Sequence, residues 1–445
     1  MKRRMFTLAV TAALALSLLG MSALAVEGDI PAPELESAPV LPEGGEDAPV
    51  EEPPEDAPQA DDLGTGSGSG PVNIYIPDPA GTISFQNVED RMREGNLQVL
   101  ALQENVDMLA EIDYEDLRED LRLQLNQIAK GQWMMVQMGQ SGTLAYERMD
   151  QAYDAVREQF DAIKDGDMQA DNADTIRQLQ SLQNQIVMAG EATYIALSAM
   201  DLQEAGLQRQ LAALDRAVTE MRLRYDLGQI SALQLSQTEA GRTSLDSGLA
   251  TLQMNLNTYK GQLELLVGAE ISGEAALGPV PEVSAKELAA MDLEADLETA
   301  KANSWDLYEA EQTLEDDHQA YKDAGGYSAH REGQLQYEQA QHTWKAAQHT
   351  YHNTVQNFEL AFRNLYLQVK DYAQVLSAAR TALAVEEDSL AAARLKYQQG
   401  TISQNALLEA EDKVKTAQEK VDSAGIDLFS SYNTYRWAVD HGILN

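Results

Sequence analysis

The feature of this sequence that most limits its fold is a glycine-containing stretch that occurs twice. One copy reads LRYDLGQISALQL, from Leu223 to Leu235, and the other reads LKYQQGTISQNAL, from Leu395 to Leu407. Leu, Tyr, Gly, Ile, Ser and a final Leu recur in the same order, with the two glycines 172 residues apart. The repetition predicts two halves that contain the same interruption.

The residues on both sides of each stretch follow a helical pattern. Apolar residues recur every three or four positions, as they do in the a/d seam of a coiled coil. Between Gly81 and Gly278 there is no proline, and there is none after Pro281. The sequence therefore predicts long helices that pack against one another through these seams: Leu207, Leu211, Leu214, Val218, Leu245, Leu249, Leu252, Leu256, Phe358, Phe362, Leu365, Val369, Ala410, Val414, Ala417 and Val421.

Each glycine stretch is expected to be the turn of an antiparallel helical hairpin. Gly228 and Gly400 allow the positive φ that often ends a helix, and Ser231 and Ser403 are suitable N-caps for the helix that returns. We therefore expect two long hairpins with the same tip, the first arm of which runs from Ala173 to Leu227.

The start of the chain differs in composition from the rest. Residues 1–25 have a basic start, an apolar run and an A-x-A ending at Ala25, as in a secretory signal peptide. Residues 26–80 are acidic and contain 11 of the 13 prolines, which predicts a disordered tail. This tail is either a spacer across the cell envelope or an unselected leader.

The remaining chain is expected to contain two helical repeats. The first covers residues 81–278, with its tip at 225–231, and the second covers residues 279–445, with its tip at 397–403. Pro279 and Pro281 mark the hinge between them. The repeats open alike, and the interval from opening to tip is about 36 residues longer in the first.

Charge and motif content exclude several functions. The formal net charge is −40, so the surface repels nucleic acid and an anionic bilayer is an unfavourable docking surface. There is no cysteine, which excludes disulfides and thiol chemistry. The sequence contains no G-x-S-x-G, HExxH or P-loop motif, and we expect neither an enzyme nor a bound cofactor.

This combination of features resembles the TolC-like outer membrane efflux protein family. The resemblance is carried by the signal peptide, the paired openings TISFQNVEDRMREGNLQVLALQENV and AMDLEADLETAKANSWDLYEAEQTL, and the two tips. The halves also close alike, with LLVGAEISG and YRWAVDHGIL. It covers roughly Gly81 to Leu444.

The resemblance implies a homotrimeric exit duct in the cell envelope. An adaptor from an ABC or proton-driven exporter would meet the tips, whose matching residues are Tyr225, Gly228, Ile230, Ser231, Tyr397, Gly400, Ile402 and Ser403. The family often has acidic residues six and nine positions after the second tip glycine. The matching residues here are Ala406 and Glu409, with Gln234 and Gln237 in the first repeat, so a lumen constriction would contain Gln234, Gln237 and Glu409.

The strands of that family do not fit this sequence. The break Asp323–Gly333 is too short for two membrane strands, and Gly131–Tyr146 is apolar without alternation. Its flanks, Tyr114–Ile128 and Tyr146–Ile163, have helical patterns. We therefore predict an all-α fold of two coiled-coil hairpin repeats with the membrane β-barrel absent or vestigial, in an outer membrane or in an envelope without a standard one.

Three smaller groups of residues have competing interpretations. His342, His349 and His352 share a helical face, for which a solvated surface is favoured over a metal site. Asp165-Gly-Asp167 is expected to be a turn rather than a calcium loop. A third group either touches a membrane or, as we favour, is buried against a neighbouring helix: Trp133, Met134, Met135 and Met138.

The function predicted from these observations is a passive exit-duct component of an export system. Ile230 and Ile402 are expected to be exposed at the tips unless a partner covers them. The alternative is a non-conducting coiled-coil spacer or scaffold that spans the envelope. A self-associating chain favours the duct, and a monomer favours the scaffold.

Overall fold

The computed structural model describes residues 78–79, 81–326 and 335–444, which lie in one compact unit. Long helices dominate these residues. The strands within them are β1 (Thr82–Ile83) and β2 (Ala276–Leu277), which pair in parallel. The all-α fold class is therefore confirmed. No helix in the described ranges combines the length and the apolar character needed to cross a membrane.

The first half contains one very long helix and its return. Helix α6 has 60 residues and ends at Asp226, one residue before the predicted end of the arm, but it begins six residues earlier than predicted. It packs against α7, which has 35 residues. The elements of this half are η1 (Phe85–Asn87), α2 (Val88–Gly95), α3 (Leu97–Ala110), α4 (Tyr114–Gln137), α5 (Leu144–Asp165), α6 (Asp167–Asp226) and α7 (Ala232–Leu266).

The second half repeats this plan. Helix α11 has 64 residues and packs against α12, which has 38. Residues 327–334, which include most of the predicted break Asp323–Gly333, lie outside the described residues. The elements of this half are α8 (Ala285–Ala290), α9 (Leu293–Asn303), α10 (Trp305–Gly326), α11 (Leu335–Gln398) and α12 (Gln404–His441).

An asparagine braces the opening of each half to the end of its last helix. The Asn96 Nδ2 donates a hydrogen bond to the Leu266 carbonyl at 2.9 Å, where α7 ends. The Asn303 Nδ2 donates to the Val439 carbonyl at 2.9 Å and to the Asp440 carbonyl at 3.2 Å, where α12 ends. The openings that look alike in sequence therefore make the same kind of contact.

The same junctions require glycine. Gly268 and Gly442 follow α7 and α12 with φ values of +66° each. A Cβ on Gly268 would meet the backbone of Gly95, and a Cβ on Gly442 would meet the backbone of Ser304. Both positions combine a left-handed conformation with a close backbone approach, so no other residue fits without rearrangement.

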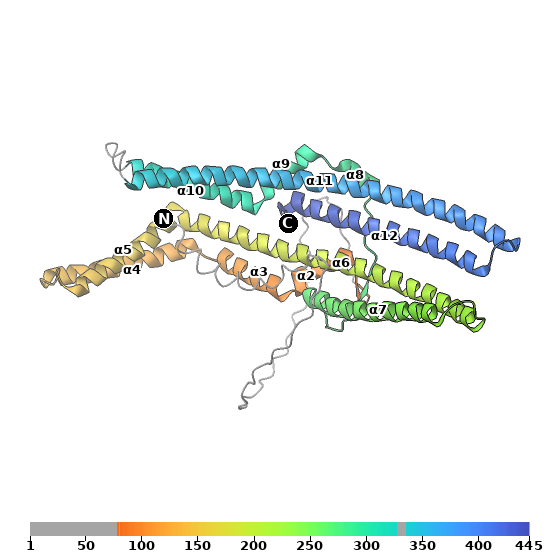
Figure 1. The fold of residues 1–445 in the computed structure, drawn as a ribbon. Helices are drawn as coiled ribbons and strands as arrows, with labels where there is room; N and C mark the ends of the chain where they lie inside the picture. Colours follow the sequence, from red (N-terminus) through yellow and green to blue (C-terminus); the bar gives the residue numbers. More distant parts are fainter. Residues whose placement is uncertain (1–77, 80, 327–334, 445) are drawn as a thin grey trace, which may run out of the picture. The chain divides into compact units, whose positions relative to one another are not determined.

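The four long helices form a layer in the order α7–α6–α12–α11. The two hairpins are held together by packing between α6 and α12, which leaves α7 and α11 as the outer helices (Figure 1). The seam residues Phe362 and Val369 of α11 are fully buried, and Leu256 of α7 is 2% exposed. The a/d seams predicted from the sequence thus form much of the core.

The first half contains an additional hairpin made of α4 and α5. These two helices pack mainly against each other, and α5 makes a smaller contact with α6. The predicted helical flanks of Gly131–Tyr146 are confirmed as α4 and α5. Gly131–Gln137 continues α4, so most of the segment is helix and turn. This hairpin accounts for the longer interval between opening and tip.

Candidate docking site at the hairpin tips

The turn between α6 and α7 ends the first long helix with a Schellman motif. The Gly228 amide donates to the Tyr225 carbonyl at 2.9 Å, and the Gln229 amide donates to the Arg224 carbonyl at 2.8 Å. Gly228 has φ +69°, as predicted. These two bonds satisfy carbonyls that the helix end would otherwise leave unpaired.

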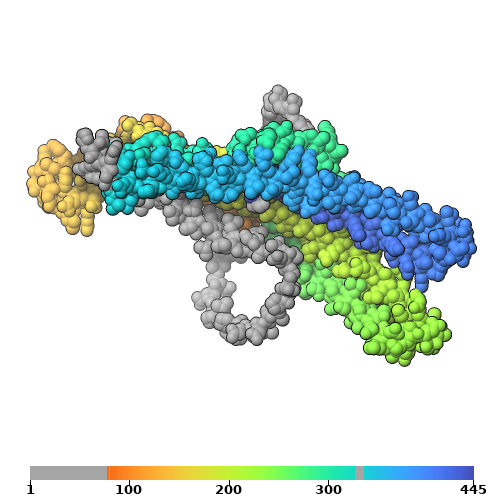
Figure 2. All heavy atoms as spheres, turned by 45° about the horizontal axis from the view of Figure 1, so that its top comes forward, coloured from red at the N-terminus to blue at the C-terminus, as the bar shows by residue number. Residues whose placement is uncertain are grey.

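The turn between α11 and α12 has the same hydrogen bonds. The Gly400 amide donates to the Tyr397 carbonyl at 2.9 Å, and the Thr401 amide donates to the Lys396 carbonyl at 2.9 Å. Gly400 has φ +70°. The two sequence copies therefore form two copies of one backbone shape, and Figures 1 and 2 show both turns at the same end of the layer.

Both predicted N-caps are confirmed. The Ser231 Oγ accepts from the Gln234 amide at 3.3 Å, and the Gln234 Oε1 accepts from the Ser231 amide at 3.0 Å, which forms a capping box. The Ser403 Oγ accepts from the Ala406 amide at 3.2 Å. Gln234 therefore stabilises the start of α7.

The residues predicted for a lumen constriction are exposed. Gln234 and Gln237 lie in the first turns of α7, and Glu409 lies near the start of α12. The structure gives these three side chains no common contact within one chain. Their role at a constriction stays a prediction.

The apolar surface of the tips differs from the prediction in one respect. Ile230 and Ile402 are half-buried, so the expectation that they are exposed is wrong. Each lies between the glycine and the N-cap serine, where the chain reverses and passes close to both helix ends. The exposed apolar side chains at the tips are Leu223 (60%), Tyr225 (43%), Leu227 (64%), Leu233 (67%), Leu395 (59%) and Tyr397 (40%).

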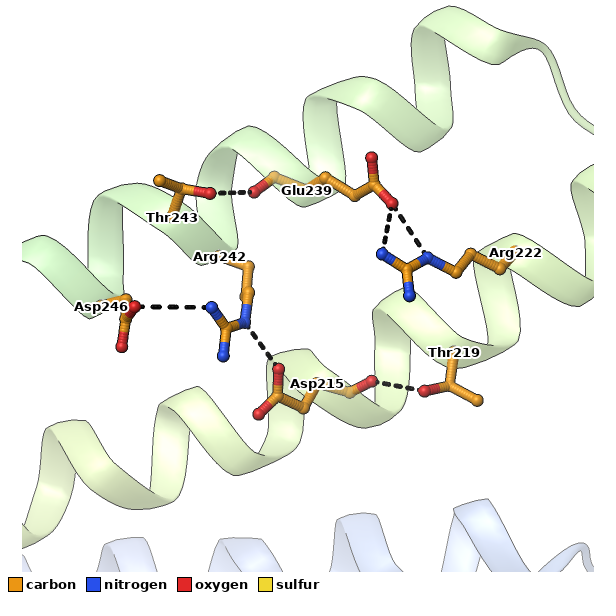
Figure 3. A network of polar contacts seen from close by, with 7 residues as sticks. All are labelled: Asp215, Thr219, Arg222, Glu239, Arg242, Thr243 and Asp246. Atoms are coloured by element: carbon orange, nitrogen blue, oxygen red, sulfur yellow. Dashed lines mark hydrogen bonds and ion pairs between the residues drawn. The ribbon is translucent and has the colours of Figure 1, made fainter.

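Ion pairs join the two arms of the first hairpin close to its tip (Figure 3). The Arg222 guanidinium donates to Glu239 Oε1 at 2.8 and 2.9 Å. The Arg242 Nε donates to Asp215 Oδ1 at 2.8 Å, and this hydrogen bond raises the pKa of Arg242. All four side chains are partly exposed, so each pair contributes only a modest stabilisation.

A second set of polar contacts joins the two hairpins to each other. Arg209 pairs with Glu419 and Arg216 pairs with Asp412, each from α6 to α12. Nearer to the tips, the Asn405 Nδ2 donates to Glu220 Oε2 at 3.1 Å. These contacts fix the register between the hairpins, and therefore the spacing of the two tips.

A buried glutamate holds α6 and α12 together farther from the tips. Glu191 is 5% exposed, and its Oε2 accepts from Asn433 Nδ2 at 2.7 Å and from Trp437 Nε1 at 2.6 Å. Burial raises the pKa of Glu191, and the two hydrogen bonds oppose this effect only in part. The carboxylate is therefore a buried polar anchor between the two helices, whereas the ion pairs nearer to the tips are partly exposed.

The structure also bears on the smaller groups of residues that had competing interpretations. In the described ranges, no three His, Asp or Glu side chains are placed to hold a metal ion. Gly166 has φ +88° and forms the turn from α5 to α6, which confirms the turn interpretation of Asp165-Gly-Asp167.

The interpretation of the third group as buried is wrong for most of its members. Trp133, Met134 and Met138 are 61%, 53% and 64% exposed, and Met135 is half-buried. Among the described residues no helix covers them, because α4 turns back at Gly139 and packs on α5 by another face. The sequence signal for this turn was Gly139 followed by Thr143, a helix end followed by an N-cap.

The class defined by these elements is an all-α chain of two pseudo-symmetric hairpin repeats. No family model and no curated protein matches the sequence. Solved structures do match in fold: the outer membrane protein VceC of Vibrio cholerae (16% identity, 62% of this chain and 76% of that chain, TM-score 0.42), CusC (14%, 82% and 95%, 0.48) and the outer-membrane channel OprN (12%, 80% and 90%, 0.48).

Every one of these TM-scores is below 0.5 and every identity is below 25%, so no conclusion about function rests on them.

Proposed function

We propose that this chain is a TolC-like exit-duct component of an export system in the cell envelope. It works as a passive conduit that docks to an adaptor, and through it to an inner-membrane pump of the ABC or proton-driven type, by means of its two hairpin tips. The observation that carries the proposal is the repetition of one tip geometry, described above, at the same end of two adjoining hairpins.

The tips fit a docking role because their apolar residues are not needed for packing. Leu227 is 64% exposed and Tyr397 is 40% exposed, although both adjoin turns whose backbone is fully defined. An aromatic or aliphatic residue that is exposed beside a rigid turn is a suitable anchor for a partner helix. The two tips therefore offer a partner the same kind of anchor twice, at a spacing that the contacts between α6 and α12 set.

The order of the helices supports assembly into a ring. Inside one chain, the first long helix of one repeat (α6) packs on the second long helix of the other (α12). The outer helices correspond in the same way, because α11 is the first long helix of the second repeat and α7 is the second long helix of the first repeat. If α11 of one copy packs on α7 of the next, every contact between neighbouring long helices has the same type, and a head-to-tail contact of this kind forms a ring when its rotation closes.

The outer helices also carry the apolar residues that such a contact would cover. Leu360, Leu367 and Val385 on α11 are 60%, 61% and 59% exposed, and Met254 and Leu265 on α7 are 63% and 58% exposed. Leu360 and Leu367 are seven residues apart, the spacing of a coiled-coil seam. We propose a homotrimer, as the sequence resemblance implies.

The docking proposal is tested with the double variant Leu227→Asp plus Tyr397→Asp. Both positions are exposed, so the melting temperature is expected to stay within about 2 °C of the parent. Adaptor and pump subunits that co-purify with the parent are expected to be lost, and export with them. The matched control is Leu123→Asp on α4, which is 50% exposed and distant in sequence from both tips. Undiminished co-purification with the double variant contradicts the docking role.

A further inference from the structure

The end of the α4–α5 hairpin is a built turn with an apolar surface. Helix α4 ends at Gly139, which has φ +71°. The Gly139 amide donates to the Val136 carbonyl at 3.0 Å, and the Gln140 amide donates to the Met135 carbonyl at 2.8 Å. Thr143 then caps α5, with its Oγ1 accepting from the Tyr146 amide at 3.4 Å. The turn therefore has a defined structure of its own.

The large apolar side chains at this end are open to solvent. The hairpin lies at one end of α6, and its tip is remote from the α6–α7 turn (Figure 1). The large apolar side chains at the hairpin end that are at least half exposed are Trp133 (61%), Met134 (53%), Val136 (50%), Met138 (64%) and Leu144 (65%). No other turn between described helices exposes a tryptophan, and exposed apolar groups of this size gathered on one turn indicate an interaction surface.

These side chains cover a wider part of the helix end than one narrow stripe. At about 100° per residue, Trp133, Met134, Val136 and Met138 project over an arc of about 200° around α4. A helix that docks in a protein groove needs apolar residues on one face only. An apolar surface that covers about 200° of α4 and continues on α5 with Leu144 fits a medium that contacts several sides of the hairpin end at once.

The same segment contains no charge. From Gly131 to Tyr146, 16 residues in succession are uncharged, in a chain whose charged residues make up 23% and whose net charge is −40. The nearest charged residues are Lys130, Glu147 and Arg148, whose formal charges sum to +1. Charged side chains are the groups that a lipid environment excludes most strongly, whereas a protein partner would tolerate them.

We propose that the end of the α4–α5 hairpin, residues 131–146, inserts into the headgroup–acyl boundary of a lipid bilayer. Trp133 and Met138 enter the apolar side of that boundary, where the amphipathic indole ring is favoured. The polar side chains of the turn, Gln137, Gln140 and Ser141, oppose deeper entry, so insertion is shallow. The surface recognised is an uncharged one, because the segment offers no cation to anionic lipids.

This contact is independent of the tip docking described above. It uses residues at the start of the first repeat, and the partner-binding turns at Gly228 and Gly400 take no part in it. A chain that fails to bind an adaptor can therefore still bind lipid, and the two proposals fail separately.

The first test places a dye at the hairpin end. The chain has no cysteine, so Met138→Cys gives a single site for an environment-sensitive fluorophore. The control is Met108→Cys on α3, which is 59% exposed against 64% for Met138. The chain is purified after export, without the predicted signal peptide, and mixed with phosphatidylcholine vesicles. We expect a blue shift and a rise in emission of about twofold or more at position 138 only.

The second test removes the apolar surface. The variant Trp133→Gln, Met134→Gln and Met138→Gln is expected to keep the helical circular dichroism of the parent, since all three side chains are exposed. Its flotation with phosphatidylcholine vesicles is expected to fall about tenfold or more. Binding of the parent is expected to be unchanged between 50 mM and 500 mM salt, because no ion pairing contributes.

Three results would overturn the proposal. One is a variant that floats as well as the parent. Another is binding that needs anionic lipid and falls with salt, because this indicates electrostatic attachment elsewhere. The last is a blue shift at position 138 that occurs without vesicles and grows with protein concentration, because this indicates that a second copy of the chain covers the hairpin end. If the dye itself perturbs position 138, Leu144→Cys gives the same readout from α5.

Discussion

At the scale of single residues, two buried glutamates hold parts of the structure that helical periodicity does not specify. The Glu264 carboxylate is 2% exposed and gathers the loop after α7 around itself. It accepts from the Ser272 amide and hydroxyl, both at 2.6 Å, from the Gly273 amide at 2.7 Å and from the Ala275 amide at 3.1 Å. Ala275 directly precedes β2, so this carboxylate positions the parallel strand pair.

The stability supplied by Glu264 is expected to depend on pH. Burial acts to raise the pKa of Glu264, but the hydrogen bonds from Gly273, Ser272 and Ala275 outweigh it, so the pKa lies below its usual value of 4.5. A lowered pKa gives stability that is present above the unfolded-state pKa and is lost as the pH falls through the folded-state pKa. At pH 7, Glu264→Gln is expected to lose about 1–3 kcal/mol, since an amide accepts at only one atom.

Urea denaturation at a series of pH values from 3 to 7 measures this difference. The gap between parent and Glu264→Gln should narrow below about pH 4.5. Glu270→Gln, an exposed change in the same loop, is the matched control and should change stability by less than about 0.5 kcal/mol at every pH. A gap that does not vary with pH contradicts the role assigned to the carboxylate.

Glu191 is expected to behave in the opposite way. Its pKa is raised by burial, so the folded state holds the proton more tightly and stability falls as the pH rises between the unfolded-state and folded-state pKa values. Glu191→Gln removes that pH dependence, and its single oxygen can still accept from Asn433 and Trp437. Glu191→Ala leaves both donors unpaired and is expected to destabilise by about 2–4 kcal/mol. Thermal unfolding at pH 5 and pH 8 distinguishes the two variants.

At the scale of elements, two glycines with the same backbone conformation show the cost of a positive φ separately from the cost of a steric clash. Gly228 and Gly268 have nearly the same φ, +69° and +66°. A Cβ on Gly228 meets nothing within 4 Å, whereas a Cβ on Gly268 would overlap the backbone of Gly95. We expect Gly228→Ala to destabilise by about 1 kcal/mol, and Gly268→Ala by more than about 3 kcal/mol.

Urea unfolding of the two single variants checks this ratio, with Gly241→Ala as a control within α7, where a Cβ also meets open space. That control should stabilise slightly, because alanine is the better helix former. Equal losses at positions 228 and 268 would mean that the approach of Gly268 to Gly95 is not needed for folding.

Most of the elements could be predicted from the sequence, and the exceptions have physical causes. Heptad spacing and the Gly-x-Ile-Ser turns predicted the long helices, because period and turn chemistry are local properties. The exposure of Ile230 and Ile402 was predicted wrongly, because it depends on how a turn folds back on two helices. The burial of Trp133 was predicted wrongly, because the absence of a covering helix is not a local property.

The same reasoning explains why the glutamates were missed. Glu264 and Glu191 lie in helices, where glutamate is a common residue, and the sequence around them does not indicate which groups they bind. Asn433 and Trp437 come from the other half of the chain, more than 240 residues away from Glu191. Contacts of this kind require the tertiary structure.

At the scale of the whole molecule, the exposed outer helices predict self-association. Leu360→Glu together with Leu367→Glu places two charges on the seam of α11. If that seam packs on α7 of a second copy, each buried leucine contributes about 1.5–3 kcal/mol, so the double variant should weaken association by about 100-fold or more. Sedimentation at micromolar concentrations measures the change, with Met108→Glu plus Leu123→Glu, which are 59% and 50% exposed, as the control. A parent chain that is monomeric under these conditions supports the scaffold alternative.

The extra α4–α5 hairpin, which within the described residues only the first repeat carries, has a consequence for any such ring. Two repeats fused in one gene can diverge separately, whereas two copies of a half-length ancestor cannot. The junctions at Asn96 and Asn303 make the same kind of contact, while the extra hairpin belongs to one repeat alone. Around a closed ring, the extra hairpin therefore recurs at alternate repeats, and the rim that carries it has half the rotational symmetry of the helical layer beneath.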